Sequence, residues 1–158
     1  MKIILTTLCL VLLNTMVVQA QRLNLEPGLN AMARNGVPEG WTEVAWLSAD
    51  GEMTVSASQG DSFEVALELS GLVPDGTYAV WGASRGTFNV RIRPIAGNTP
   101  DSFVATAEGT AIHAVSIPDD ADHRFLVITY QPDGVPAGNK PGDAAFGHFI
   151  AEFPEPRN

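Results

Sequence analysis

Residues 62–70, SFEVALELS, alternate between apolar side chains and small or charged ones. The apolar members occupy every second position: Phe63, Val65, Leu67 and Leu69. Successive side chains of a strand point to opposite faces of a sheet, so this alternation predicts a strand with one buried and one solvated face. An amphipathic helix would instead place its apolar residues about 3.6 positions apart, and the run excludes it.

The same kind of signal recurs along the chain from Trp41. Runs rich in β-branched and aromatic residues are cut by Gly, Pro or Asp, and they read WTEVAWL, MTVSA, SFEVALELSGL, TYAVWGA, TFNVRIRPI, SFVATAE, TAIHAVSI, RFLVITYQ and HFIAEF. Turn residues about every 8–12 positions are typical of sandwiches and barrels. We therefore expect an all-β fold, a single antiparallel immunoglobulin-like or fibronectin-like β-sandwich of about seven to nine strands that spans residues 41–154.

Particular runs carry more specific expectations. The Asp-Gly in SADGE predicts a hairpin between WTEVAWL and MTVSA. In TFNVRIRPI the apolar residues Phe88, Val90 and Ile92 should face inward, while Arg91 and Arg93 face outward. RFLVITYQ has apolar residues on both faces, which predicts a central strand of its sheet.

Residues 1–20 have the form of an export signal. A short basic start and a long apolar run end in VQA, with Val18 and Ala20 at the small-residue positions that a signal peptidase reads. We expect cleavage between Ala20 and Gln21. The alternative is an uncleaved membrane anchor, because the apolar run approaches about 18 residues.

The rest of the chain is expected to form one domain with a short extension. Residues 21–40 show weak periodicity and end in a Val-Pro-Glu-Gly turn. We interpret them as an N-terminal arm with one helical turn near residues 29–34. The sandwich domain, residues 41–154, is long enough to bury a core without cross-links.

The charge balance limits the partners. The chain carries 9 Lys and Arg against 18 Asp and Glu, a net charge of −9 at pH 7. This excess disfavours nucleic acids and anionic membrane surfaces. The single cysteine, Cys9, would leave with the signal, so the exported chain would have no disulfide and no thiolate. We expect a periplasmic or extracellular protein with no further transmembrane segment, whose partner is an extracytoplasmic protein or a glycan.

The stretch LVPDGTY, residues 72–78, marks a corner. Its spacing of Leu72, Pro74 and Tyr78 matches a tyrosine corner, in which the chain crosses between sheets and the buried hydroxyl bonds a backbone group a few residues upstream. Proline fixes φ, and glycine permits the turn. We therefore interpret Tyr78 as structural. Trp81, three positions further on, should lie on the other face of the same strand.

The segment LSGLVPDGTYAVWG resembles a motif of exported bacterial β-sandwich proteins, many of them uncharacterised, with fibronectin type III or immunoglobulin-like architecture. The tail FLVITYQPDGVPAGNKPGDAAFGHFIAEFP is similar to the last third of such proteins, so the likeness covers residues 61–153. It implies a fold and an exported location, and it implies no activity. In these families a histidine sometimes follows the tyrosine that ends the core strand. Gln131 stands there in this chain, which weakens a metal role.

Three histidines are candidate metal ligands: His113, His123 and His148. Imidazoles of this kind could hold zinc or copper if the fold brought them together. Their spacing matches no ligand motif. The alternative is structural, with His113 half-buried and bonded to a backbone carbonyl, and the other two in solvent. We expect no cofactor, with a divalent metal as the alternative.

The loop PDGVPAGNKPGD, residues 132–143, is the feature most suggestive of function. Loops of this length without secondary structure are uncommon in compact domains and are often functional. The candidate ligand-binding residues are Trp81, Tyr130, Gln131, Lys140, Arg91 and Arg93. For the two arginines, ion pairs with Glu64 and Glu68 on a neighbouring strand are the alternative.

These patterns favour a non-catalytic binding or interaction module that presents loops from a rigid sandwich. The alternative is a periplasmic zinc or copper protein that uses His113 and His148, with or without His123. A small hydrolase is least favoured, because no recognisable motif places a nucleophile against a histidine.

Overall fold

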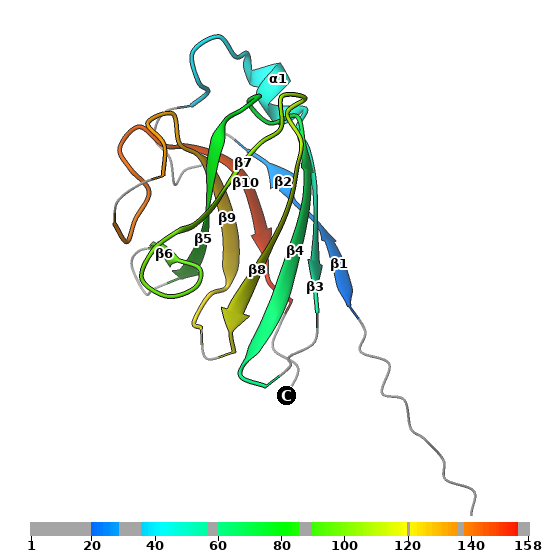
Figure 1. Ribbon diagram of the computed structural model, residues 1–158, viewed down its shortest axis with the longest axis vertical. Coiled ribbons are helices and arrows are strands. Elements are labelled where there is room, and N and C mark those ends of the chain that lie inside the picture. Colours follow the sequence, from blue (N-terminus) through cyan, green and yellow to red (C-terminus); the bar gives the residue numbers. More distant parts are fainter. Residues whose placement is uncertain are drawn as a thin grey trace, which may run out of the picture.

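The structure is a computed structural model that describes residues 20–28, 36–56, 60–85, 90–119, 121–135 and 138–154. It consists of two antiparallel sheets packed together, with one short helix at one end (Figure 1). The predicted all-β sandwich is confirmed. Within the described ranges, no helix has the length and apolar character needed to cross a membrane.

One sheet has four strands in the order β1-β3-β4-β8. Their bounds are β1 Gln21–Asn24, β3 Asp50–Val55, β4 Ser62–Ser70 and β8 Ala111–Pro118. The pairing of β4 with β8 sets Val65 opposite Val115 and Leu67 opposite His113. Because residues opposite each other in a sheet share a face, His113 points to the same side as these core residues.

The other sheet has six strands, in the order β2-β10-β9-β5-β6 with β7 also paired to β5. Their bounds are β2 Glu26–Pro27, β5 Thr77–Arg85, β6 Val90–Pro94, β7 Asp101–Val104, β9 Phe125–Tyr130 and β10 Phe146–Glu152. β9 lies between β10 and β5 and is buried along residues 126–129. The expectation of a central strand is therefore confirmed.

The main core lies between the sheets. Val65, Leu67 and Leu69 are buried there, and Phe63 packs against them, as the alternation in residues 62–70 predicts. From the six-stranded sheet they are faced by Tyr78, Val80, Leu126 and Ile128. Burying one such side chain stabilises the fold by roughly 1.5–3 kcal/mol, so the period-two pattern accounts for much of the driving force.

A second, smaller cluster lies on the outer face of the six-stranded sheet. It contains Ala79, Trp81, Ala83 and Val127, each with no exposed surface. Tyr78 belongs to the main core. Trp81 therefore lies on the opposite face of β5 from Tyr78, as expected.

The side chains of β6 point in the opposite directions from those we expected, and the outer cluster explains why. Arg91 and Arg93 pair with Ser84 and Gly82, on the face of β5 that Tyr78 shares, although both arginines are exposed. Ile92 packs instead into the outer cluster. The apolar residues of β6 thus point away from the main core, because a second apolar surface exists there. Phe88 lies outside the described residues.

Residues 43–47, predicted as strand, instead form the helix α1, Glu43–Leu47. Thr42 caps it, since its Oγ1 accepts the N–H of Ala45 at 3.1 Å. Trp46 is the buried residue of the helix, and its indole N–H donates to the carbonyl oxygen of Gly147 at 3.2 Å. The short apolar run WTEVAWL fits either structure, and the cap and this distant contact favour the helix.

The predicted hairpin at SADGE is wrong, because the run before it forms the helix α1 and not a strand. Asp50 and Gly51 are the first residues of β3 rather than a turn between strands. A Cβ at Gly51 would lie 2.9 Å from side-chain carbons of both Leu25 and Leu69. The glycine therefore serves close packing inside the core.

The expected N-terminal arm is built into the sandwich. β1 pairs with β3, and β2 pairs with β10, so this short segment adds a strand to each sheet. These additions, with α1 in place of one expected strand, give ten strands among the described residues. Residues 1–19 and 29–35 lie outside the described residues, so the signal, the cleavage between Ala20 and Gln21 and the helical turn stay predictions.

Candidate binding groove

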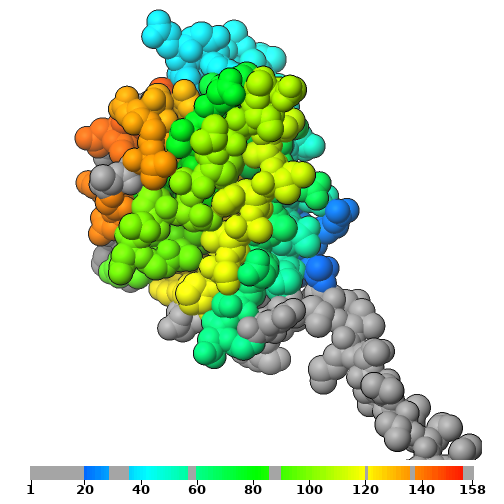
Figure 2. Space-filling view, viewed as in Figure 1, coloured from blue at the N-terminus to red at the C-terminus, as the bar shows by residue number. Residues whose placement is uncertain are grey.

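A groove of about 750 Å³ opens at the α1 end of the sandwich. Three parts of the chain form it, namely the residues before α1, the ends of β9 and β10, and the loop between those strands. It is lined by Val37, Pro38, Glu39, Tyr130, Pro132, Asp143, Ala144 and Phe146. Figure 2 shows the segment around α1, in cyan, next to the loop after β9, in orange. The groove is shallow and largely open to solvent, unlike the enclosed pockets of about 300–1,000 Å³ that bury most of a small ligand.

Tyr130 and Phe146 form the aromatic floor of the groove. They end β9 and begin β10, and they are paired in the ladder between these strands. Their ring centroids lie 6.2 Å apart with an interplanar angle of 30°. Both side chains are half-buried. The two rings are held by β9 and β10, which are neighbouring strands of the six-stranded sheet. The floor is therefore positioned before any ligand binds.

Trp46 packs behind the floor. Its ring meets those of Tyr130 and Phe146 edge-on, at 6.5 Å in each case. Trp41 lies at 5.7 Å from Trp46 in a T-shaped arrangement. Edge-to-face pairs of this kind add about 0.5–1.5 kcal/mol each beyond their buried area. The helix α1 is thus fixed to the sheet by aromatic packing, and the segment that precedes it forms one wall of the groove.

A chain of hydrogen bonds runs beneath these rings. His148 stacks on Trp46 at 3.6 Å, and its Nε2 lies 3.2 Å from the Trp46 carbonyl oxygen. A carbonyl can only accept, so Nε2 carries the proton and donates. Nδ1 then accepts from the Tyr78 hydroxyl at 3.3 Å, and the hydroxyl oxygen accepts the N–H of Val73 at 2.9 Å. Both ring nitrogens of His148 are therefore occupied.

Burial sets the protonation of this network. His148 has no exposed surface, and burial lowers its pKa from 6.5 to about 4, against the opposing effect of the Trp46 carbonyl. Burial also raises the pKa of Tyr78 well above its ordinary value, although the Val73 hydrogen bond opposes the shift. Both groups are neutral at pH 7, which is the state that the hydrogen bonds require.

The Tyr78 contact lies where the chain crosses from β4 in one sheet to β5 in the other. The Tyr78 hydroxyl accepts a backbone N–H five positions upstream, and the Tyr78 ring is fully buried. Both features agree with the structural interpretation of Tyr78.

Gly76 makes room for the floor of the groove. A Cβ at this position would lie 2.7 Å from the Val73 carbonyl oxygen and 3.0 Å from Cε2 of the Tyr130 ring. The glycine of LVPDGTY therefore lets the Tyr130 ring pack directly against the corner.

The loop is anchored at its start by a buried polar group. Thr129 Oγ1 accepts the indole N–H of Trp81 at 2.8 Å and the side-chain N–H of Gln131 at 2.6 Å. The backbone N–H of Gln131 also donates to the Thr77 carbonyl at 2.8 Å. Trp81 and Gln131 thus hold the outer face of the sheet and the base of the loop, while Tyr130 faces the groove.

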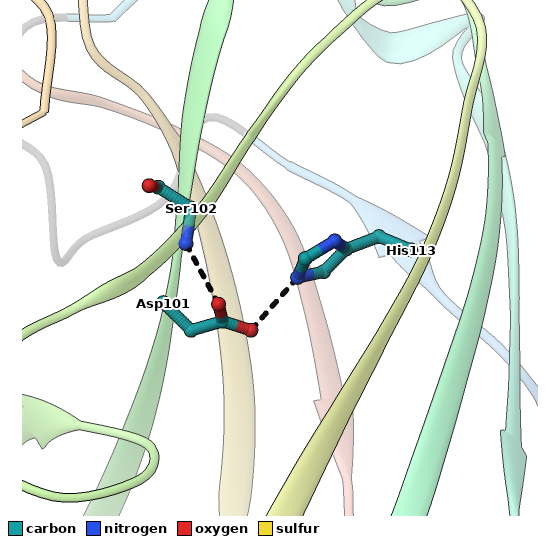
Figure 3. Close-up of polar contacts among 3 residues, drawn as sticks. All are labelled: Asp101, Ser102 and His113. Atoms are coloured by element: carbon teal, nitrogen blue, oxygen red, sulfur yellow. Dashed lines mark hydrogen bonds and ion pairs between the residues drawn. The ribbon is translucent and has the colours of Figure 1, made fainter.

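His113 makes a separate contact at the edge of the sandwich. Its Nε2 lies 2.7 Å from Oδ2 of Asp101, whose Oδ1 accepts the N–H of Ser102 at 3.0 Å (Figure 3). His113 belongs to β8 and Asp101 to β7, so the pair ties one sheet to the other. The expectation of a half-buried His113 holds, but its partner is a carboxylate and not a backbone carbonyl.

His123 lies apart from the other two histidines. Its ring packs on Gly82 so closely that a Cβ there would overlap it, and burial together with the charge of Arg93 lowers its pKa. His123 is half-buried and His148 is fully buried, so the expectation that both are in solvent is wrong. Across the described ranges, no three His, Cys, Asp or Glu side chains are placed to hold a metal ion.

The structure brings together only part of the predicted ligand-binding set. Tyr130 lines the groove with the loop, whereas Trp81 and Gln131 lie behind it in the polar anchor. Lys140 is exposed on the loop. Arg91 and Arg93 lie on β6, and no ion pair joins them to Glu64 or Glu68.

Several groove residues were not among the candidates: Val37, Pro38, Glu39, Pro132, Asp143, Ala144 and Phe146. Pro132 and Asp143 belong to the loop 132–143, which the sequence predicts to be functional. Phe146 is the first residue of β10 and follows the loop closely. An aromatic residue in this position is a sequence signal for a groove next to the loop. Residues 37–39 carry no such signal, because only the folded chain sets them against the loop.

Comparison of the chain with protein-family models, curated proteins and solved structures finds no match.

Proposed function

We propose that this chain is an exported, non-catalytic binding module, and that the groove at the α1 end is its recognition site for a segment of an extracytoplasmic protein or for a glycan. The groove itself carries the proposal. It combines a floor of two aromatic rings with apolar walls in a shallow hollow that is open to solvent and accessible to a chain segment.

The support beneath the groove favours recognition. The floor residues sit on adjacent central strands, and the wall at residues 37–39 is continuous with a helix that Trp46 fixes to β10. A preformed site avoids the entropy cost of ordering its residues when the ligand binds. Loops and strand ends of rigid sandwiches commonly serve in this way.

A blocking substitution tests the proposal. Ala144 is half-buried in the groove, and Ala144→Phe would fill it without removing a core contact. Ala114→Phe is the matched control, since Ala114 is exposed on β8 away from the groove. We expect a panel of proline-rich and lysine-rich pentapeptides and of chito- and cello-oligosaccharides to contain ligands that raise the melting temperature of the wild type and the control but not of Ala144→Phe. A panel whose hits stabilise all three proteins equally would contradict a binding role for the groove.

The exported location is tested separately. Protein recovered from the exported fraction should begin at Gln21 when its N-terminus is sequenced. A chain that still begins at Met1 would contradict cleavage, and it would favour the anchored alternative.

A further inference from the structure

We propose that residues 121–124, which lead into β9, form a pH-sensitive latch that the neutral ring of His123 holds closed and that protonation of this ring releases. The latch lies at the opposite end of β9 from the groove, away from α1 (Figure 1). The inference is therefore independent of the proposed function. It rests on how the His123 ring is packed and on what this packing denies to a second ring proton.

The His123 ring fills a space that Gly82 leaves in β5. Tyr78 and Val80 point from β5 into the main core, and by alternation position 82 faces the same side. A Cβ at Gly82 would overlap Nδ1, Cγ and Cε1 of the ring. The imidazole therefore takes the place of a core side chain at this end of the sandwich.

The backbone of the latch is joined to the strands on both sides of β9. The N–H of Arg124 donates to the Ala83 carbonyl oxygen at 2.9 Å, and the Arg124 carbonyl oxygen accepts the N–H of Phe153 at 2.8 Å. Ala83 directly follows the glycine that the ring covers. Loss of the ring from Gly82 should therefore weaken the neighbouring bond to Ala83, which makes the Arg124 amide a reporter of the latch.

One nitrogen of the His123 ring is buried and has no hydrogen-bond partner, namely Nδ1. The ring also has a hydrogen bond with the backbone of Ile95 that favours its protonated form, so the ring donates this bond, through Nε2. In the neutral ring Nδ1 is then an unprotonated acceptor. Protonation would turn it into a charged N–H donor that is buried without an acceptor, and this costs more than one missing neutral hydrogen bond.

The surroundings of the ring oppose its protonation. Burial lowers the pKa of His123 most and the charge of Arg93 lowers it further, while the Ile95 hydrogen bond and the charge of Asp122 act in the other direction. The face of β5 that contacts the ring carries no charged side chain. The other charged side chains on the described segments that meet at this end are Asp61, Arg85, Arg91, Asp119, Arg124 and Glu152.

Falling pH therefore favours release of the ring. A ring in solvent has a pKa near the ordinary value of 6.5, and the pKa of the packed ring is lower. The released ring takes up the proton first, so the closed latch is fully favoured above pH 6.5 and becomes less favoured as the pH falls toward the pKa of the packed ring.

Hydrogen exchange at the Arg124 amide tests the latch. Its protection factor is measured between pH 7.5 and 5.5 in the wild type and in His123→Phe, whose ring cannot take up a proton. The amide of Val65, in the core strand β4, reports unfolding of the whole sandwich. We expect Arg124 protection to fall about three- to tenfold in the wild type and to stay constant in His123→Phe.

Two arginine variants test the same claim with the ring in place. Removing the charge of Arg93 in Arg93→Gln should raise the NMR titration midpoint of the His123 ring by a few tenths of a pH unit. Because the pKa of the packed ring then lies closer to that of the released ring, Arg124 protection should fall less than in the wild type. Arg91→Gln is the matched control, since Arg91 is also exposed on β6, and it should behave as the wild type does.

Four results would overturn the inference. Constant Arg124 protection in the wild type would show that the ring is protonated without release. An equal fall in His123→Phe would assign the opening to another group, and an equal fall at Val65 would show general unfolding. If His123→Phe does not fold, equal midpoints and equal falls in the wild type, Arg93→Gln and Arg91→Gln would contradict the latch.

Discussion

His148 and His113 stabilise two different regions of the sandwich, the first through buried contacts with neutral groups and the second through a partly exposed contact with a carboxylate. His148 has no exposed surface, bonds only neutral groups and has a pKa lowered to about 4. His113 is half-buried at the edge between the sheets and bonds the carboxylate of Asp101. The first region supports the groove from below, and the second ties the two sheets together. The comparison shows that burial and partners, rather than residue type, decide what each histidine does.

The largest effect should come from Trp46, which joins α1 to the region around His148. Trp46→Ala should cost about 3–5 kcal/mol of unfolding free energy, because a fully buried aromatic side chain is lost and a cavity remains. Urea unfolding measures it. Trp41→Ala is the control, since Trp41 is only half-buried, and its cost should be less than half as large. Equal losses of unfolding free energy in the two variants would contradict the claim that the buried Trp46 contributes more to stability than Trp41.

The pH dependence of stability should reflect the burial of His148. Because the folded pKa of His148 lies below the unfolded value of 6.5, the unfolded chain takes up the proton first as the pH falls. The contribution is therefore fully present above pH 6.5 and is lost as the pH falls toward 4, by about 3 kcal/mol in total. Unfolding curves between pH 7 and 4.5 should be flatter for His148→Gln than for the wild type. A loss of stability in His148→Gln as steep as that of the wild type would contradict this assignment.

The Tyr78 hydroxyl should have a smaller effect of its own. Tyr78→Phe keeps the ring but leaves the Val73 N–H and Nδ1 of His148 without their partner, at a cost of about 1–3 kcal/mol. Tyr130→Phe is the control, because the Tyr130 hydroxyl forms no hydrogen bond with the described residues. Its unfolding free energy should change by less than about 0.5 kcal/mol. Similar losses in both variants would argue against the hydrogen-bond chain.

The edge contact should matter least. Asp101→Asn should cost at most about 1 kcal/mol, since the side chains of Asp101 and His113 keep 31% and 18% of their surface exposed. Urea unfolding of the variant and the wild type checks it. A loss as large as that of Trp46→Ala would mean that the edge, not the aromatic region, carries the stability.

What the sequence predicts well is what local pattern determines. The alternation in residues 62–70 identifies β4 and its buried face, and the two apolar faces of residues 125–130 identify the central strand β9. Both follow from side-chain periodicity alone. The tyrosine at position 78 was predicted to be buried, and it is.

What the sequence does not predict depends on distant partners. The run that became α1 is short enough to be helix or strand, and its contact with Gly147 spans 101 positions. β1 and β2 carry weak patterns and gain their structure by pairing with β3 and β10. The groove joins residues 37–39 to Asp143, Ala144 and Phe146, and no local signal specifies that meeting.

The most direct test of the central claim is to map where a bound ligand touches the protein. Backbone amide chemical shifts or hydrogen exchange would be recorded with and without the best ligand from the peptide and oligosaccharide panel. We predict that the changes gather at residues 37–39 and 143–146, with little effect on residues 111–118 of β8. Changes centred on Arg91 and Arg93, or spread evenly over the sandwich, would contradict the assignment of the groove as the recognition site.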